Sequence, residues 1–162
     1  MSLFLHELTH LVISLCIGFL VWKKYKKAFP AFFAAILGGF FIDADHLFDY
    51  YLVFGLDFNL KNFLESQQFL LSNKLYVPFH AWEWVALLSF LYLKLDKQPK
   101  KRDFKISKYL LSFLLALTLG IYSHLIIDII TNKVVISGYS IIYRAVNNFN
   151  SDTLTNEKLP IH

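Results

Sequence analysis

The sequence predicts an all-α fold, an integral membrane bundle of about four transmembrane helices. Of its 162 residues, 56% are hydrophobic and 18% are aromatic, which is more than a soluble domain usually carries. The apolar residues are concentrated in four runs that polar segments separate, and a helix needs roughly 20 such residues to cross a bilayer. The length fits one domain, which we expect over residues 1–150, followed by a polar tail over 151–162.

The four apolar runs cover residues 3–22, 28–42, 77–95 and 109–131. Basic residues follow the first run rather than precede it, and His6, Glu7 and His10 interrupt it. A cleaved signal peptide has the opposite order, so we expect an uncleaved first span. The second run is short for a full span, and Pro30 fits its first turn. Residues 47–76 are expected to form a loop with short interfacial helices.

The lysines and arginines predict the orientation in the membrane. Eleven of the sixteen lie in two segments, 23–27 and 94–108. Basic loops stay on the cytoplasmic side, and with four spans both segments fall on that side. Both termini and the 47–76 loop then face outward in a multi-pass protein of the plasma membrane. Because the lysines flank apolar runs, the net charge of +4 indicates membrane topology and a lipid bilayer as partner, not nucleic-acid binding.

The stretch from Gly38 to Asp49 puts three carboxylates and an imidazole at the end of an apolar run. Acids are costly beside hydrocarbon, which favours a functional reason for them. Asp43, Asp45 and His46 offer hard oxygen ligands and one nitrogen, a set that suits a divalent metal. The alternative is a helix end followed by solvated acids in a loop. The other three runs bear on this choice.

Each run carries two polar side chains three or four residues apart, a spacing that puts both on one helical face. The pairs are His6 and His10, Asp43 and His46, His80 and Glu83, and His124 and Asp128. The predicted topology brings all four pairs to the extracytoplasmic side, and metal sites in helix bundles are built from such facing side chains. A buried ion-pair network is the competing explanation, but these motifs contain no Lys or Arg. Mixed imidazole and carboxylate ligands favour zinc, as one, two or more ions, with manganese or iron as alternatives.

A different interpretation starts from His6-Glu7-Leu8-Thr9-His10, which matches the H-E-x-x-H motif of zinc proteases. It predicts an intramembrane zinc metalloprotease in which Glu7 is the general base and Asp128 or Asp45 is the third ligand. We rank it second because it gives no role to most of the remaining candidates, namely Asp43, Asp45, His46, His80 and Glu83. A third interpretation is a non-catalytic metal-binding membrane protein.

Three motifs follow one another over residues 1–131: Thr9-His10, Asp43-Ala44-Asp45-His46, and Gly120-Ile121-Tyr122-Ser123-His124-Leu125-Ile126-Ile127-Asp128. Their order resembles that of the YdjM-like family of membrane-bound metal-dependent hydrolases, whose motifs are T-H, P-D-x-D-H and G-x-x-x-H-x-x-x-D. Ile42 stands where that family usually has proline, and the segment around His80 lacks its fuller H-R-G-x-T-H-S form. The family is distantly similar to zinc-dependent phospholipase C and P1-type nucleases.

This resemblance implies a hydrolase that cleaves a phosphoester, lipid-like or other, with a metal-activated water whose pKa is about 7. The expected metal ligands are His6, His10, His46, His80, His124 and Asp128. Asp43 or Asp45 would bridge two metals or act as the catalytic base. Glu83 would be a ligand, a catalytic group or a residue that orients His80.

Two further residues are candidates for substrate binding. Arg144 would clamp a phosphate, and its alternative is a plain surface arginine. Trp82, with Trp84, Tyr50 and Tyr51, would form an interfacial lip for a lipid, although an aromatic belt explains these side chains as well.

Overall fold

A computed structural model describes residues 3–97, 107–132 and 134–155. The described chain is helical and contains no β-strand, only two isolated bridges. It divides into two compact units. The first unit is Met1–Ile42 with Trp82–Asp128, and the second is Asp43–Ala81 with Ile129–His162.

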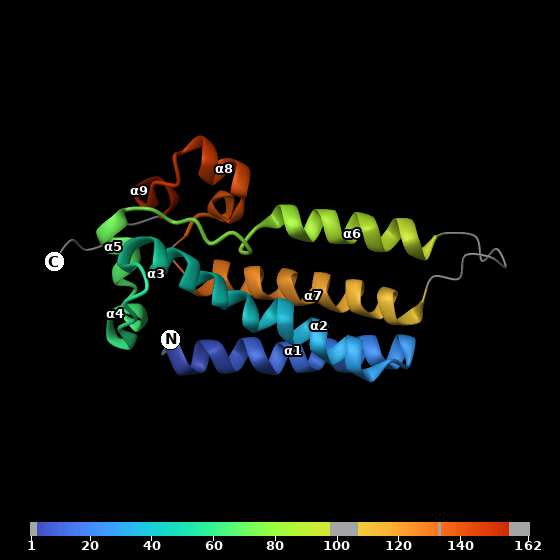
Figure 1. The fold of residues 1–162 in the computed structure, drawn as a ribbon. Helices are drawn as coiled ribbons and strands as arrows, with labels where there is room; N and C mark the ends of the chain where they lie inside the picture. Colours follow the sequence, from blue (N-terminus) through green and yellow to red (C-terminus); the bar gives the residue numbers. More distant parts are fainter. Residues whose placement is uncertain (1–2, 98–106, 133, 156–162) are drawn as a thin grey trace. The chain divides into compact units, whose positions relative to one another are not determined.

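Four helices build the first unit: α1 (Leu3–Tyr25), α2 (Ala28–Gly39), α6 (Trp82–Asp96) and α7 (Lys108–Thr131), the last of which ends in the second unit. Figure 1 shows them lying alongside one another. Two of them, α1 and α7, are long and apolar enough to cross a membrane, and α2 with the helical stretch after it makes a third candidate if the two count as one broken span. The all-helical membrane prediction is therefore confirmed at the level of two, or up to three, candidate spans, and four spans remain a prediction.

Small residues let α2 approach its neighbours closely. Ala31, Ala34 and Ala35 have no exposed surface, and a Cβ atom on Gly120 of α7 would lie 2.8 Å from the carbonyl oxygen of Ala35. Backbone contact of this kind is typical of helix interfaces in membranes, where small side chains allow close van der Waals packing. The two glycines that end α2 therefore serve packing, because a Cβ on Gly39 would also meet Ser14 of α1.

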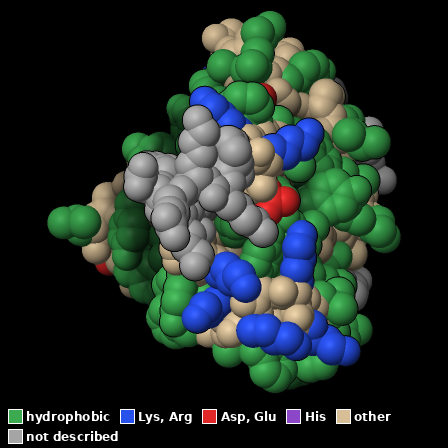
Figure 2. All heavy atoms as spheres, turned by 90° about the vertical axis from the view of Figure 1, so that its right-hand side faces the viewer, with side chains coloured by type: hydrophobic (Ala, Val, Ile, Leu, Met, Phe, Trp, Pro, Cys, Tyr) green, Lys and Arg blue, Asp and Glu red, His purple; other side chains and the backbone are tan. Residues whose placement is uncertain are grey.

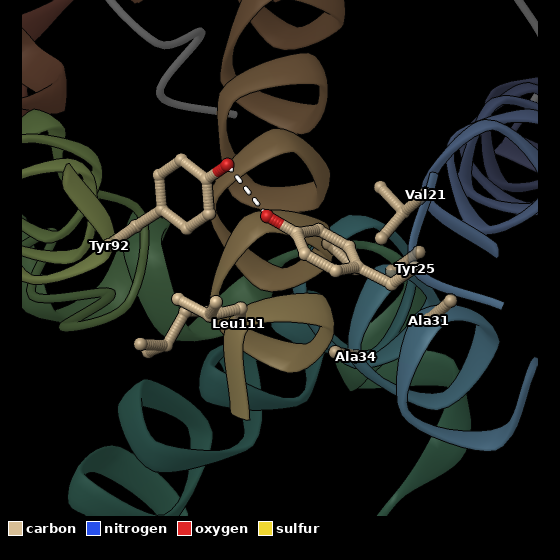
Figure 3. Close-up of a cluster of buried hydrophobic side chains, with 9 residues drawn as sticks. Val21, Tyr25, Ala31, Ala34, Tyr92 and Leu111 are labelled. Carbon is tan, nitrogen blue, oxygen red and sulfur yellow. Dashed lines mark hydrogen bonds between the residues drawn. The ribbon is translucent and has the colours of Figure 1, made fainter. Parts of the chain in front are cut away.

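A buried cluster holds one end of the first unit together (Figure 3). Val21 and Tyr25 of α1 pack there with residues of the other three helices. The hydroxyl of Tyr25 lies 2.8 Å from that of Tyr92, and Lys24 Nζ donates to the same Tyr92 hydroxyl at 2.8 Å. Basic side chains gather on the face that Figure 2 shows. The last turn of α1 carries Lys23 and Lys24, and the last turn of α6 carries Lys94. Residues 98–106 of the predicted basic loop lie outside the described residues.

Short helices build the second unit: η1 (Phe41–Asp45), which crosses its boundary, then α3 (His46–Phe54), α4 (Leu60–Leu64), α5 (Gln67–Ser72), η2 (Ile136–Tyr139), α8 (Ile141–Val146) and α9 (Ser151–Leu154). The short helices expected within 47–76 are present as α3, α4 and α5. Part of the predicted polar tail forms α9, in which Ser151 and Leu154 are buried. Residues 156–162 of that tail lie outside the described residues.

The third apolar run does not begin as a helix. We predicted a helix from residue 77, but α6 begins at Trp82. Pro78 has no N–H group, and it disfavours a helical conformation at the preceding Val77. His80 therefore lies in an irregular segment of the second unit, whereas Glu83 lies on α6 of the first. The prediction that these two residues share one helical face is wrong.

Candidate metal centres

In the first unit, three imidazoles surround the carboxylate of Asp128. Nε2 of His6 and Nε2 of His10 lie 3.3 and 3.4 Å from Asp128 Oδ1, and Nε2 of His124 lies 3.3 Å from Oδ2. The Nε2 atoms of His6 and His10 are 3.0 Å apart, and the ring of His10 stacks on that of His124 with 3.9 Å between centroids. We call these four residues the first cluster.

The first cluster follows from helical spacing on two candidate spans. His6 and His10 are one turn apart on α1, as are His124 and Asp128 on α7, so each pair projects from one face. His124 Nδ1 lies 3.2 Å from the carbonyl oxygen of Gly39. When Nδ1 donates to that carbonyl, Nε2 is left with a lone pair directed at Asp128, the arrangement typical of a metal-binding histidine.

The first cluster has the chemistry of a metal site. At 3.0 Å, at most one of the two Nε2 atoms of His6 and His10 can place a proton on the line between them. Ligand atoms of His6, His10 and Asp128 all lie within 4.8 Å of one another. Two nitrogens and a carboxylate oxygen form a donor set that suits Zn²⁺, and Nε2 of His124 lies at the other carboxylate oxygen. The side chains of His10 and His124 are fully buried, so little of this cluster is accessible to solvent.

The second unit contains another group of ligands around Asp43. Asp43 Oδ1 lies 3.3 Å from Nε2 of His46 and 3.1 Å from Nε2 of His80, and the three ligand atoms lie within 4.8 Å of one another. We call Asp43, His46 and His80 the second cluster. The side chains of His46 and Asp43 keep 30% and 24% of their surface exposed, against 3% for His80. Asp43 and His46 are thus partly accessible to solvent, whereas His80 is buried.

Asp45 orients His80 from the opposite edge of its ring. Nδ1 of His80 lies 3.0 Å from Asp45 Oδ1, and Asp45 Oδ2 also accepts a hydrogen bond of 2.8 Å from the backbone N–H of Phe79. Burial disfavours the charged imidazolium, but the hydrogen bonds to Asp43 and Asp45 outweigh it and raise the pKa of His80 to about 10. A cation bound at Nε2 would take the place of a proton that the two carboxylates already stabilise.

Two buried charged residues hold the irregular segment that carries His80. Asp49 Oδ2 accepts a hydrogen bond of 2.8 Å from the N–H of Val77. Arg144 has no exposed surface and donates 3.0 Å hydrogen bonds to the carbonyls of Val77 and His80. The surface alternative for Arg144 is therefore wrong, and its Nη atoms bind backbone rather than face solvent. This scaffolding was not predicted, because no local pattern links Arg144 to a segment more than sixty residues earlier.

The remaining candidates fall outside both clusters. Glu83 and Trp82 lie at the start of α6, and the ring of Trp82 is 6.2 Å from that of Tyr122. Tyr50 is fully buried, so the prediction that it forms part of an exposed lip is wrong, whereas Tyr51 is 41% exposed.

Comparisons of the chain with protein-family models, with curated proteins and with solved structures gave no match.

Proposed function

We propose that this chain is an integral membrane, metal-dependent hydrolase that cleaves a phosphoester, with its catalytic metal at the second cluster. The observation that carries the proposal is the contrast between the two clusters. Catalytic metal sites keep a coordination position open for water and substrate, whereas structural sites are closed by protein ligands. Asp43 and His46 of the second cluster keep 24% and 30% of their side-chain surface exposed, whereas the side chains of His10 and His124 in the first cluster are fully buried.

The position of the first cluster supports a bound cation there. Its residues lie on α1 and α7, the two helices that are apolar enough to span a membrane. Asp128 lies near the end of α7 and only 4% of its side chain is exposed, so its charge is buried away from water at a cost in free energy. A divalent metal would offset this cost and bind the imidazole lone pairs. Zinc is our first choice, with manganese or iron as alternatives.

Asp43, His46 and His80 would hold a divalent metal, and Asp45 keeps the His80 ring in its orientation through Nδ1. Such a metal would supply a water nucleophile near neutral pH by lowering the pKa of the bound water. Asp43 is the candidate base for the water proton, because 24% of its side-chain surface is exposed whereas the side chain of Asp45 has none. Assignment to the YdjM-like family is part of this proposal.

The proposed topology puts the lysine-rich end of the first unit in the cytoplasm. His10 precedes Lys23 by thirteen residues on α1, a helical distance of about 20 Å. The first cluster would therefore lie at the extracytoplasmic side of the membrane.

An intramembrane protease remains a second candidate, because His6, His10 and Asp128 do come together beside Glu7 on α1. Two features weigh against it. Nε2 of His124 approaches the other oxygen of the same carboxylate and its side chain is fully buried, so little of this position is accessible to water or substrate. The protease also leaves the second cluster without a role.

The test combines metal analysis with hydrolysis of bis(4-nitrophenyl) phosphate by the purified full-length chain, loaded with zinc or manganese. We expect turnover by the wild type, loss of turnover with retained metal at the first cluster in His46→Ala, and unchanged turnover in Glu7→Gln. Lys61→Ala, at an exposed position of the second unit, is the control. Protein that is stoichiometrically metal-free after purification without chelators would overturn the proposal. Cleavage of peptides that depends on Glu7 would favour the protease.

A further inference from the structure

The turn between α3 and α4 presents large apolar side chains outward. Leu56 is 95% exposed, and four others in the segment 52–64 are between 46% and 59% exposed. We call these five residues the apolar tip: Leu52, Leu56, Phe58, Leu60 and Leu64. Single exposed leucines are ordinary, but five within one short segment mark a surface that meets another apolar phase.

The apolar tip has a rigid support beneath it. The ring of Tyr50 is fully buried and lies 5.3 Å from that of Phe58 and 5.7 Å from that of Phe63. Its hydroxyl accepts a 2.8 Å hydrogen bond from the N–H of Asn59. Gly55 turns the chain with a φ of +62°, a conformation that glycine adopts without strain. The outward direction of the tip is thus part of the fold.

Two features of the second unit favour a lipid bilayer as the partner that the apolar tip contacts. Residues 129–131 belong to this unit and are also the last residues of the candidate span α7. This part of the unit therefore continues directly from a helix that could cross the membrane. Within segment 52–64 the charged side chains are Asp57 and Lys61, and the partly exposed Tyr51 precedes it. Apolar residues bordered by lysine and tyrosine are typical of elements that lie in the membrane interface.

A second copy of the chain fits the apolar tip less well. Four of these five side chains are only about half exposed. Together they offer less than the roughly 800 Å² that each partner of a stable dimer buries.

We propose that the apolar tip inserts into the interfacial layer of the bilayer, roughly 5–10 Å below its surface. Helix α3 connects this tip to the second cluster, since it begins at His46 and ends at Phe54 (Figure 1). Its length is about 12 Å along the axis. Insertion therefore holds the second cluster close to the lipid headgroups. This inference does not depend on catalysis at that cluster.

The experiment uses the full-length chain in a Cys16→Ser background, with a nitrobenzoxadiazole label at Leu56→Cys. The protein is reconstituted into vesicles of phosphatidylethanolamine and phosphatidylglycerol. Quenching by lipids that carry a spin label near the headgroup is compared with quenching by aqueous iodide. The matched control is a label at Thr153→Cys, an exposed position on α9 of the same unit. We expect several-fold stronger quenching by lipid than by iodide at Leu56, and the reverse at Thr153.

Two results would overturn the inference. Iodide quenching at Leu56 as strong as at Thr153 would place the tip in water. Protection from both quenchers would mean that protein, such as a second copy, covers it. Leu60→Cys repeats the measurement at another tip position if the first labelled chain does not fold, as judged by its thermal unfolding.

Discussion

Arg144 donates a hydrogen bond from Nη2 to the backbone carbonyl of His80, at 3.0 Å. A second bond, from Nη1, reaches the carbonyl of Val77 at the same distance. Pro78 interrupts regular structure in this segment, so its carbonyls have no helical donors. The guanidinium replaces those donors, and the carboxylate of Asp49 accepts from the N–H of Val77. A candidate metal ligand is thus held by a residue from a distant part of the chain.

Replacement of Arg144 by methionine should destabilise the second unit. The His80 carbonyl would lose its Arg144 donor, and the Val77 carbonyl would keep only the 3.1 Å bond from the His80 N–H. A buried carbonyl left without its donor costs about 1–3 kcal/mol. Arg144→Lys should recover only part of the stability, because a single ammonium cannot reproduce the planar fork that reaches both oxygens. The measurement is the thermal unfolding temperature in detergent, with Lys61→Met as an exposed control. Unfolding of Arg144→Met at the wild-type temperature would contradict this role.

The two clusters should bind metal independently of each other. Asp128→Asn removes a charged donor from the first cluster, and His46→Ala removes a nitrogen from the second. We expect each variant to lose one metal equivalent and keep the other, as measured by elemental analysis after passage over a desalting column. Asp152→Asn, on exposed surface, should retain the wild-type content. If either single variant loses all of its metal, the chain holds one shared centre instead of two.

Gly120→Ala should disturb the first cluster without touching a ligand. The added Cβ would lie 2.8 Å from the carbonyl oxygen of Ala35 and 3.0 Å from the nitrogen of Gly39, and backbone cannot move aside easily. Overpacking of this kind costs about 1–3 kcal/mol. Separation of α2 from α7 would also lengthen the contact between His124 Nδ1 and the Gly39 carbonyl.

The readout for Gly120→Ala is the unfolding temperature together with metal retained during a chelator titration. Leu119→Ala, one residue away and partly exposed, is the matched control. Loss of metal at a lower chelator concentration is expected in the glycine variant alone. Equal behaviour of both variants would show that close packing at this glycine does not support the cluster.

Local pattern accounts for the parts of the site that were predictable from sequence. His6 with His10, and His124 with Asp128, lie on long uninterrupted helices, where a spacing of four residues determines which side chains share a face. The same reasoning failed at His80, because hydrophobicity continues through residues 77–81 although the helix does not. Pro78 was the available signal, since the residue before a proline avoids helical conformation.

Contacts between distant segments were not predictable from one sequence. The hydrogen bond from Arg144 to the His80 carbonyl joins residues 64 positions apart, and no sequence motif contains both residues. The sequence also did not determine how Asp43 and Asp45 differ. In the structure Asp43 lies against Nε2 of His80 and Asp45 against Nδ1 of the same ring. This difference follows from side-chain geometry rather than from spacing.

The number of spans can be decided by cysteine labelling. In a four-span topology, Glu65 between α4 and α5 faces outward and Lys97 after α6 faces the cytoplasm. Both positions are exposed. We expect an impermeant maleimide to label Glu65→Cys in right-side-out membrane vesicles, and Lys97→Cys only after permeabilisation, both in a Cys16→Ser background. If Glu65→Cys also needs permeabilisation, the predicted topology with an outward 47–76 segment is wrong and the second cluster faces the cytoplasm. That result would leave metal binding intact, but it would move the proposed hydrolysis to the other side of the bilayer.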